Sequence, residues 1–205
     1  MTIRQVTTDK ITDTIEKLCI EANCYLTDDI FVCLQTCRAT EKSPLGKDIL
    51  NTLIENARIA RNETAPICQD TGMAVVFITI GQDVHITGGS LEDAINEGVR
   101  RGYEKGYLRK SVVRDPLDRV NTKDNTPAII HYDIVPGDKL RIIVAPKGFG
   151  SENMSGLKLL KPSQRLQGIK DFVIHTVSEA GANPCPPLIV GIGIGGTMEK
   201  SAFLS

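Results

Sequence analysis

The spacing of apolar residues changes once along this chain, near residue 62, and that change restricts the folds open to it. Before this point, apolar side chains recur every three or four residues, the period of an amphipathic helix. Ser43-Pro44 supplies a capping residue followed by a proline suited to the first turn of a helix. The pattern predicts that 1–62 is entirely helical, with helices near 9–26, 30–37 and 44–57.

Beyond residue 62, short apolar runs of strand length alternate with further helical segments. Pro136-Gly137-Asp138 separates two such runs and predicts a β-hairpin. Helices followed by a mixture of strands and helices indicate a mixed α+β fold. We expect one domain, in which a helical lead-in over 1–62 precedes a layered sheet-and-helix core over 63–205. The expected strands are 73–80, 128–135, 139–145 and 188–192, and the expected helices are 90–107, 163–180 and 197 onward.

Composition argues against several classes of protein. The formal net charge is −1, which gives no electrostatic attraction to nucleic acid or to an anionic membrane surface. The apolar runs are well short of the roughly 20 residues that a transmembrane helix needs. Residues 1–5 lack the apolar region of a signal peptide. We therefore expect a cytoplasmic protein that binds neither nucleic acid nor membrane.

The chain has 6 cysteines, which in a cytoplasmic protein are expected to be reduced or metal-bound rather than paired as disulfides. Cys19 and Cys24 belong to the first predicted helix, and Cys33 and Cys37 lie one turn apart on the second. Free cysteine is among the most buried residue types. We expect these four to be small buried hydrophobes.

The other two cysteines lie on turns beside apolar runs. Cys68 is followed by Gln69, Asp70, Thr71 and the turn glycine Gly72, so a thiol, an amide and a carboxylate stand side by side. Cys185 lies in a proline-rich turn before a second apolar run. A rigid scaffold can direct two such turns at one point. This suggests a thiolate-bound metal or cluster with an acid–base group beside it.

Each of these residues also has a purely structural interpretation. Cys68 could be a core thiol, and Asp70 in Asp-Thr-Gly could form an Asx-turn. Arg109 closes a predicted helix, where a cation complements the helix dipole. Its planar guanidinium would equally suit a substrate carboxylate.

Two glycine-containing segments suggest different chemistry. Residues 146–153 follow a predicted strand and could present backbone N–H groups to an anion. The run Gly191-Ile192-Gly193-Ile194-Gly195-Gly196 matches the dinucleotide fingerprint, but this sequence stops before the acidic residue expected about 20 positions later. A close-packed turn explains these glycines better than a cofactor site does.

Four motifs then occur in an order that resembles one known family. They are Pro66-Ile67-Cys68-Gln69-Asp70-Thr71-Gly72, Asn121-Thr122-Lys123-Asp124-Asn125-Thr126-Pro127-Ala128, Pro146-Lys147-Gly148-Phe149-Gly150-Ser151-Glu152-Asn153, and Cys185-Pro186-Pro187 leading into 191–197. Together they resemble the iron–sulfur (class I) fumarate hydratases and the alpha subunit of L-tartrate dehydratase. The resemblance extends from about Ile49 to the end of the chain.

The resemblance implies a [4Fe–4S] cluster held by three cysteines, with its fourth iron open to substrate. Cys68 and Cys185 match two of the ligand positions, and the third lies outside this sequence. Gln69 and Asp70 are implied in the substrate pocket, with Asp70 in a catalytic role. Arg109 is implied as a carboxylate anchor, and Gly148 and Gly150 as backbone donors to the substrate.

The family also completes its active site with a beta subunit or a C-terminal domain, which is expected to supply the catalytic base. The sequence ends one residue after an apolar helical face at 202–204. We therefore expect a fragment, or a subunit lacking its partner, that is inactive alone and associates into a homo-oligomer.

The leading hypothesis is a hydro-lyase that adds water to, or removes it from, a C4 dicarboxylate, with fumarate and malate first as in the tricarboxylic acid cycle. An L-tartrate dehydratase alpha subunit is the alternative substrate assignment. A metal-free binding or assembly domain is the alternative of another class, and a nucleotide enzyme using the 191–196 glycines is a weaker third.

Overall fold

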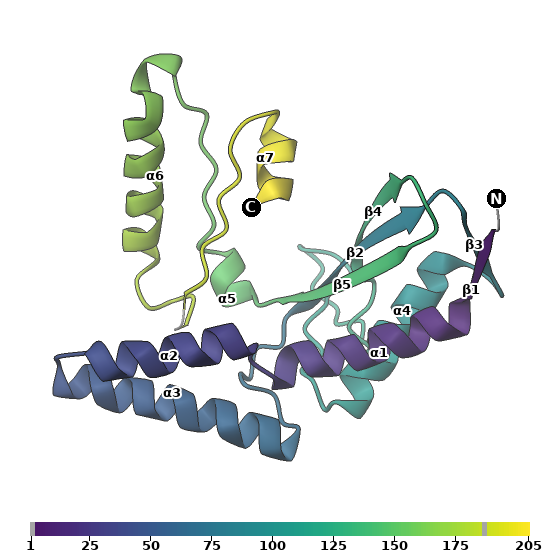
Figure 1. Ribbon diagram of the computed structural model, residues 1–205, viewed down its shortest axis with the longest axis horizontal. Coiled ribbons are helices and arrows are strands. Elements are labelled where there is room, and N and C mark those ends of the chain that lie inside the picture. The colour runs from purple at the N-terminus through teal and green to yellow at the C-terminus, as the bar shows by residue number, and fades with distance from the viewer. Residues whose placement is uncertain (1–2, 186–187) are drawn as a thin grey trace. The chain divides into compact units, whose positions relative to one another are not determined.

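A computed structural model describes residues 3–185 and 188–205. Contacts divide the chain into two compact units, Met1–Lys147 and Gly148–Ser205 (Figure 1). The change in secondary structure near residue 62 falls inside the first unit. Helices and two small sheets confirm the predicted mixed α+β class. Among the described residues, no helix is both long and apolar enough to cross a bilayer.

The first unit begins with a short strand and three helices, and the sequence signals explain where the helices start. These elements are β1 (Arg4–Thr7), α1 (Thr8–Cys24), α2 (Asp28–Thr40) and α3 (Pro44–Glu63). The Thr7 hydroxyl accepts a hydrogen bond from Lys10 N, and Ser43 does the same for Gly46 N ahead of Pro44. The three predicted helices are thus confirmed.

The main sheet has three strands, β2 (Met73–Gly81), β4 (Ile129–Val135) and β5 (Leu140–Lys147), in the order β4-β2-β5. All three were expected, but the predicted hairpin is wrong, because β4 and β5 each pair with β2 rather than with each other. β2 runs parallel to β4 and antiparallel to β5.

The turn between β4 and β5 wraps around the end of β2 instead of closing a hairpin. Three consecutive N–H groups hold it there: Gly81 N donates to Lys139 O at 2.8 Å, Gln82 N to Val135 O at 2.8 Å, and Asp83 N to Gly137 O at 2.9 Å. A side chain at Gly81 would lie 2.2 Å from Gly137 O, so only glycine allows this approach. β2 takes the centre because it is the most apolar strand and buries alternate side chains against the helices.

A second, two-stranded sheet escaped sequence reasoning, and its strand β1 shows that the prediction of an entirely helical 1–62 is wrong. β3 (Val84–Thr87) pairs in parallel with β1. Both strands have four residues, too few to establish a period of two.

The core lies where α1 and α4 (Leu91–Lys105) cover one face of the main sheet. Ala74, Val76 and Ile78 of β2 are buried there with side chains of both helices, including Ile11, Ile15, Ile95 and Val99. The helices approach closely at Gly98 and Gly102, where an added Cβ would lie 2.7 Å from Thr12 O and from Cys19 Cβ, respectively. An ion pair between Lys105 and Glu16 and a hydrogen bond from Thr12 Oγ1 to Ala94 O also join the two helices.

The cysteines of the lead-in divide into two pairs. Cys19 and Cys24 are buried, as predicted, whereas Cys33 and Cys37 are exposed, so the prediction for that pair is wrong. The reason is that α2 packs mainly against α3 and buries only Leu34 completely. Helical spacing identified one common face for Cys33 and Cys37 but not the direction in which that face points.

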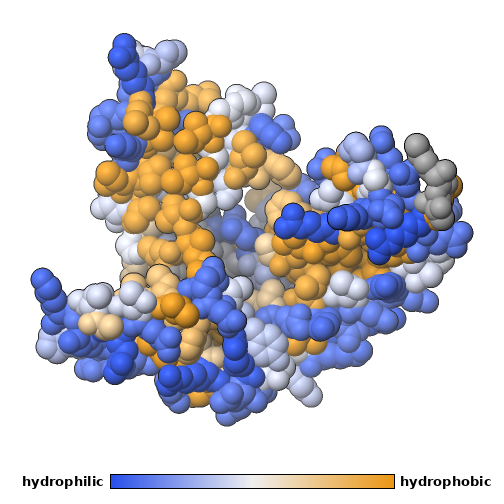
Figure 2. Space-filling view, viewed as in Figure 1, coloured by the Kyte–Doolittle hydropathy of each residue, from blue (hydrophilic) through white to orange (hydrophobic). Residues whose placement is uncertain are grey.

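The second unit contains α5 (Phe149–Glu152), the 3-10 turn η1 (Pro162–Gln164), α6 (Arg165–Ala180) and α7 (Met198–Leu204). Gly181, at φ 54°, ends α6 as predicted. Large hydrophobic side chains remain exposed on α6, including Leu166 and Ile174, and Figure 2 shows hydrophobic side chains gathered over this element.

The strand predicted over 188–192 is wrong, because the described part of this segment has no strand partner. Its apolar side chains are exposed, as they are at Ile189 and Ile192. The glycines that follow serve close packing, since a Cβ at Gly193 would lie 1.8 Å from Ser201 O of α7. Gly195 and Gly196 then turn the chain at φ 90° and 70°. Packing thus accounts for the glycines that resemble a dinucleotide fingerprint.

We predict that Gly102→Ala destabilises the protein by about 1–3 kcal/mol, because the new methyl group overpacks the contact between α1 and α4. This loss should appear although alanine is the better helix former by about 1 kcal/mol. Urea unfolding measures it. Gly46→Ala in α3 is the control, because its close neighbour is the flexible side chain of Glu41. Equal stability of the two variants would contradict the packing account.

Candidate functional site

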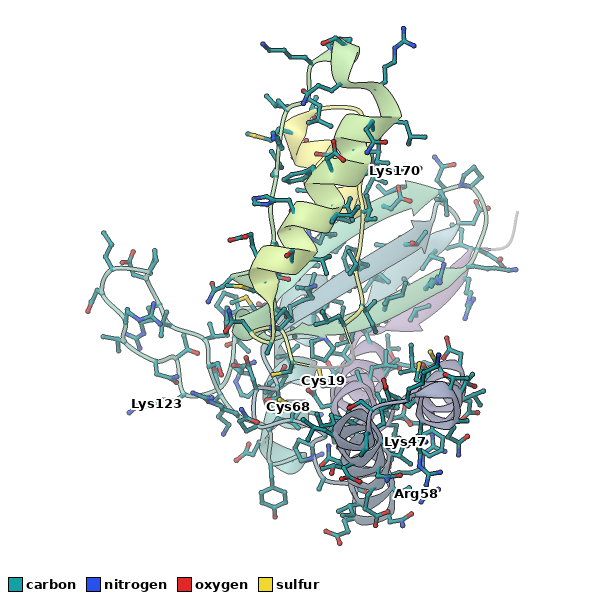
Figure 3. All side chains as sticks on the ribbon, turned by 90° about the vertical axis from the view of Figure 1, so that its left-hand side faces the viewer. Cys19, Lys47, Arg58, Cys68, Lys123 and Lys170 are labelled. Carbon is teal, nitrogen blue, oxygen red and sulfur yellow. The ribbon has the colours of Figure 1, made fainter. Side chains whose placement is uncertain are left out.

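A pocket of about 390 Å³ opens in the first unit around Cys68. One wall is the segment between α3 and β2 that carries Cys68 (Figure 3), and the other is the segment after α4 that carries Arg109. The lining residues are Pro66, Ile67, Cys68, Gln69, Thr71, Tyr107 and Arg109. The structure therefore brings Cys68, Gln69 and Arg109 around one cavity.

The Cys68 wall is a tight turn with hydrogen bonds of its own. Asp70 N donates to Cys68 Sγ at 3.4 Å, and Gly72 N donates to Asp70 Oδ1 at 3.1 Å. The second bond is the Asx-turn that the sequence suggested. Gly72, at φ 63°, completes the turn in a conformation that favours glycine.

Arg109 reaches the pocket because α4 ends earlier than the sequence indicated. The helix ends at Lys105, and Tyr107, at φ 52°, turns the chain out of helical geometry. Leu108 is buried beneath this turn, and Arg109 is exposed above it. Because Arg109 lies beyond the helix, dipole complementation is not its role. Its carbonyl oxygen accepts a hydrogen bond from Thr71 Oγ1 at 3.2 Å, which joins the two walls.

Two buried side chains that sequence reasoning missed hold the Cys68 turn from behind. Tyr103 OH donates to Thr71 O at 2.8 Å and lies 3.2 Å from Gly72 O. Asn125 Nδ2 donates to Gly72 O at 3.1 Å. Tyr103 keeps the apolar period of its helix, and its hydroxyl is the signal in the sequence, because a buried tyrosine hydroxyl needs a partner. Asn125 lay unassigned within a polar motif.

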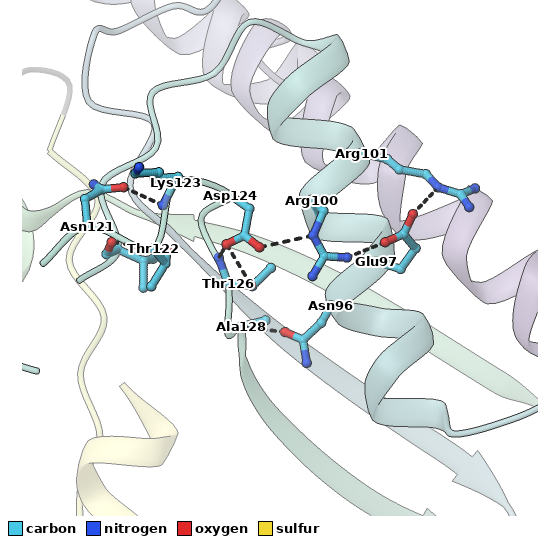
Figure 4. Close-up of polar contacts among 11 residues, drawn as sticks. Asn96, Glu97, Arg100, Arg101, Asn121, Thr122, Lys123, Asp124, Thr126 and Ala128 are labelled. Carbon is cyan, nitrogen blue, oxygen red and sulfur yellow. Dashed lines mark hydrogen bonds and ion pairs between the residues drawn. The ribbon is translucent and has the colours of Figure 1, made fainter. Parts of the chain in front are cut away.

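That polar motif is anchored to α4 by a charged network (Figure 4). Arg100 Nε donates to Asp124 Oδ2 at 3.1 Å, and Glu97 pairs with both Arg100 and Arg101. Burial acts to raise the pKa of Asp124, but hydrogen bonds from Thr126 and Arg100 outweigh it, and its pKa is lowered overall. Asp124 therefore remains a carboxylate at neutral pH and serves as an anchor for the loop.

The remaining predicted site residues lie in the second unit. Gly148 precedes the short helix α5, and a Cβ at Gly150 would lie 3.3 Å from Asn183 O, which places Gly150 close to the turn that carries Cys185. Cys185 is exposed at φ 63°, and its N–H donates to Ala182 O at 3.2 Å. Pro186 and Pro187 of this motif lie outside the described residues. The meeting of Cys68 and Cys185 at one centre stays a prediction.

The thiols differ in their suitability as metal ligands. Burial raises the pKa of Cys19 to about 12, so that thiol stays protonated at neutral pH. Cys68 is half-buried and Cys185 is exposed, and both lie on turns, where an inorganic centre could reach their sulfurs. Across residues 3–185 and 188–205, no group of three or more His, Cys, Asp or Glu side chains is placed to hold a metal ion. The two thiols thus fit part of a cluster's ligand set, and further donors must complete it.

Known hydro-lyase subunits resemble this chain over nearly its whole length. The chain is 43% identical over 202 residues to a Methanocaldococcus jannaschii protein named provisionally as an L(+)-tartrate dehydratase subunit alpha, covering 96% of this chain and 70% of that protein. It is 32% identical to the L(+)-tartrate dehydratase subunit alpha of Escherichia coli UTI89, covering 98% of this chain and 67% of that protein. Dehydratases are hydro-lyases. Residues 12–205 match the fumarate hydratase (Fumerase) family, and the chain belongs to that family.

We predict that Tyr103→Phe lowers the free energy of unfolding by about 1–3 kcal/mol, because the buried Thr71 carbonyl loses its donor. Thermal or urea unfolding checks this. Tyr25→Phe is the matched control, since the Tyr25 hydroxyl makes only an exposed contact with Thr64 at 3.4 Å. Its effect should stay within about 0.5 kcal/mol. A neutral Tyr103→Phe would show that the hydroxyl does not support the Cys68 turn.

Proposed function

We propose that this chain is the alpha-type component of a hydro-lyase that adds water to, or removes it from, a C4 dicarboxylate. Fumarate and malate are the first proposed pair, and L-tartrate is the second. The observation that carries the proposal is the pocket shared by Cys68, Gln69 and Arg109, in a chain that matches the fumarate hydratase family over residues 12–205.

Arg109 is proposed to bind a substrate carboxylate. Its exposed guanidinium can donate two parallel hydrogen bonds to a carboxylate, and the hydrogen bond from Thr71 holds its backbone. The amide of Gln69 can donate to one substrate oxygen and accept from another, so it would orient the molecule. These two residues would fix a small dianion above the Cys68 turn.

Asp70 is proposed to carry a proton during the reaction. Its carboxylate is held by Gly72 N, which fixes its orientation beside Cys68. Proton transfer by a positioned carboxylate is a standard contribution to the cleavage of a C–H bond beside a carboxylate. We propose that the partner subunit supplies the base opposite Asp70. In the second unit, Gly148 and Gly150 are proposed to direct backbone N–H groups at the substrate.

Cys68 and Cys185 are proposed as two ligands of a [4Fe–4S] cluster, with the third from outside this sequence. When bound, such a cluster supplies a Lewis-acidic iron that polarises the substrate oxygen. The relatives are named as alpha subunits, which supports a beta subunit as partner. Assembly into a homo-oligomer, a cytoplasmic location and a role in the tricarboxylic acid cycle belong to the same proposal.

The test is anaerobic reconstitution of the chain, extended to include a third cysteine, with its beta partner. We expect a brown protein that interconverts malate and fumarate, and the rate with L-tartrate decides between the two substrate assignments. Cys68→Ser should lose both iron and activity. Cys33→Ser, which replaces an exposed thiol on α2, is the control and should lose neither. Iron analysis and visible absorbance spectra measure the bound iron, and the absorbance of fumarate measures the activity.

A metal-free binding or assembly domain predicts the opposite outcome. In that case Cys68→Ser would assemble with the partner as the wild type does, and the reconstituted complex would be colourless.

We further predict that Arg109→Lys raises KM for the dicarboxylate about 10- to 100-fold, because lysine cannot reproduce the two parallel hydrogen bonds of a guanidinium. Steady-state kinetics of the reconstituted complex measure this. Arg114→Lys is the control, since Arg114 is also exposed but does not line the pocket. Equal KM values for the two variants would remove Arg109 from the substrate site.

A further inference from the structure

Asn125 is a fully buried polar side chain beneath the Cys68 pocket. Its exposed fraction is 0%, and its backbone adopts φ 61°, a left-handed conformation that asparagine tolerates better than most residues. Within the described part of the chain, its amide bonds to the backbone groups of three residues. A buried amide placed this way links the backbone segments that it contacts.

Those backbone groups belong to the two opposite walls of the pocket. Asn125 Oδ1 accepts hydrogen bonds from Ser111 N at 2.7 Å and from Val112 N at 3.1 Å, two and three residues after Arg109. Asn125 Nδ2 donates to Gly72 O at 3.1 Å, at the end of the Cys68 turn. The side chain thus spans the separation between the wall that carries Arg109 and the wall that carries Cys68.

The rest of the loop over 121–126 reaches only one of these walls. Asn121 Nδ2 donates to Lys110 O at 2.9 Å, and Thr122 N donates to Val112 O at 3.0 Å. Asp124 anchors the loop to α4 through Arg100. Among the described contacts of this loop, only those of Asn125 extend to the Cys68 turn. Asn125 therefore adds a second link between the walls to the direct hydrogen bond from Thr71 Oγ1 to Arg109 O.

We propose that Asn125 is a positioning residue that fixes the Arg109 wall relative to the Cys68 turn. Its consequence for catalysis rests on the proposed function, in which Arg109 anchors the substrate beside Cys68 and Asp70. A shift between these walls would separate the carboxylate anchor from the reacting groups, and displacements of about 1 Å can cost roughly 100-fold in rate.

The chemistry of the site explains why asparagine is suited to it. The amide has an acceptor for the two N–H groups and a donor for the carbonyl, whereas an ionised aspartate has acceptors alone. Glycine would tolerate φ 61° but would remove all three hydrogen bonds. Asn125→Gly therefore removes the link without backbone strain. Asn125→Asp keeps an acceptor for the two N–H groups, but when ionised it replaces the donor to Gly72 O with a second acceptor and buries a negative charge.

The test compares both variants with Val99→Ala in the reconstituted complex. Val99 is buried between α4 and α1, so its truncation lowers stability without altering the pocket. We expect Asn125→Gly to lose at least tenfold in kcat/KM and to exchange the amide hydrogens of 111–112 at least tenfold faster. Asn125→Asp should keep the protection of those amides and still lose kcat/KM. Val99→Ala should retain both kcat/KM and local protection.

Hydrogen exchange and kinetics separate failure of this proposal from failure of the proposed function. If the wild-type complex has no hydro-lyase activity, the proposed function fails, and exchange at 111–112 still decides whether Asn125 holds the wall. If the wild type is active and both Asn125 variants match Val99→Ala in kcat/KM, the positioning role is overturned. Unchanged exchange in Asn125→Gly overturns it as well. Should Asn125→Gly fail to fold, Asn125→Asp decides through kcat/KM.

Discussion

The close approach of α1 and α4 is the constraint on which the first unit depends. Gly98 and Gly102 let the two helix backbones come near enough for Ile15 and Cys19 to be buried between them. This contact allows both helices to lie on one face of the sheet and to cover β2. Because burial of apolar surface is the main favourable term in folding, a wider separation would weaken the whole core.

The same packing also determines where the candidate site forms. Tyr103 follows Gly102 on α4, so a helix held tightly against α1 also brings a hydroxyl under Thr71. One turn earlier on α4, Arg100 holds the loop that supplies Asn125. The Cys68 turn is therefore supported by side chains from elements that already belong to the core. Such support lets an exposed turn keep a defined geometry.

Local signals in the sequence predicted local structure well. Ser43-Pro44 predicted the start of α3, and Asp-Thr-Gly predicted the Asx-turn at Asp70. Long-range arrangement was not available from such signals. Turn residues at 136–138 suggested a hairpin because nothing local reveals that β2 lies between the flanking strands. The apolar run after residue 188 resembles a strand, but a strand also requires a partner. Asn125 was missed because its partners are up to 53 residues distant.

The central position of β2 affects the order in which the chain can assemble. Both of its neighbours lie later in the sequence, and the first register partner in β4, Ile129 opposite Val75, is more than 50 residues downstream. During synthesis, β2 therefore leaves the ribosome as an apolar strand with two unpaired edges, and its pairing is complete only after β5 has followed. Sheets whose strands pair over long sequence separations form slowly, and their unpaired strand edges can associate with other chains until pairing is complete. The nascent chain is therefore prone to aggregate from the time β2 emerges until β5 has been synthesised.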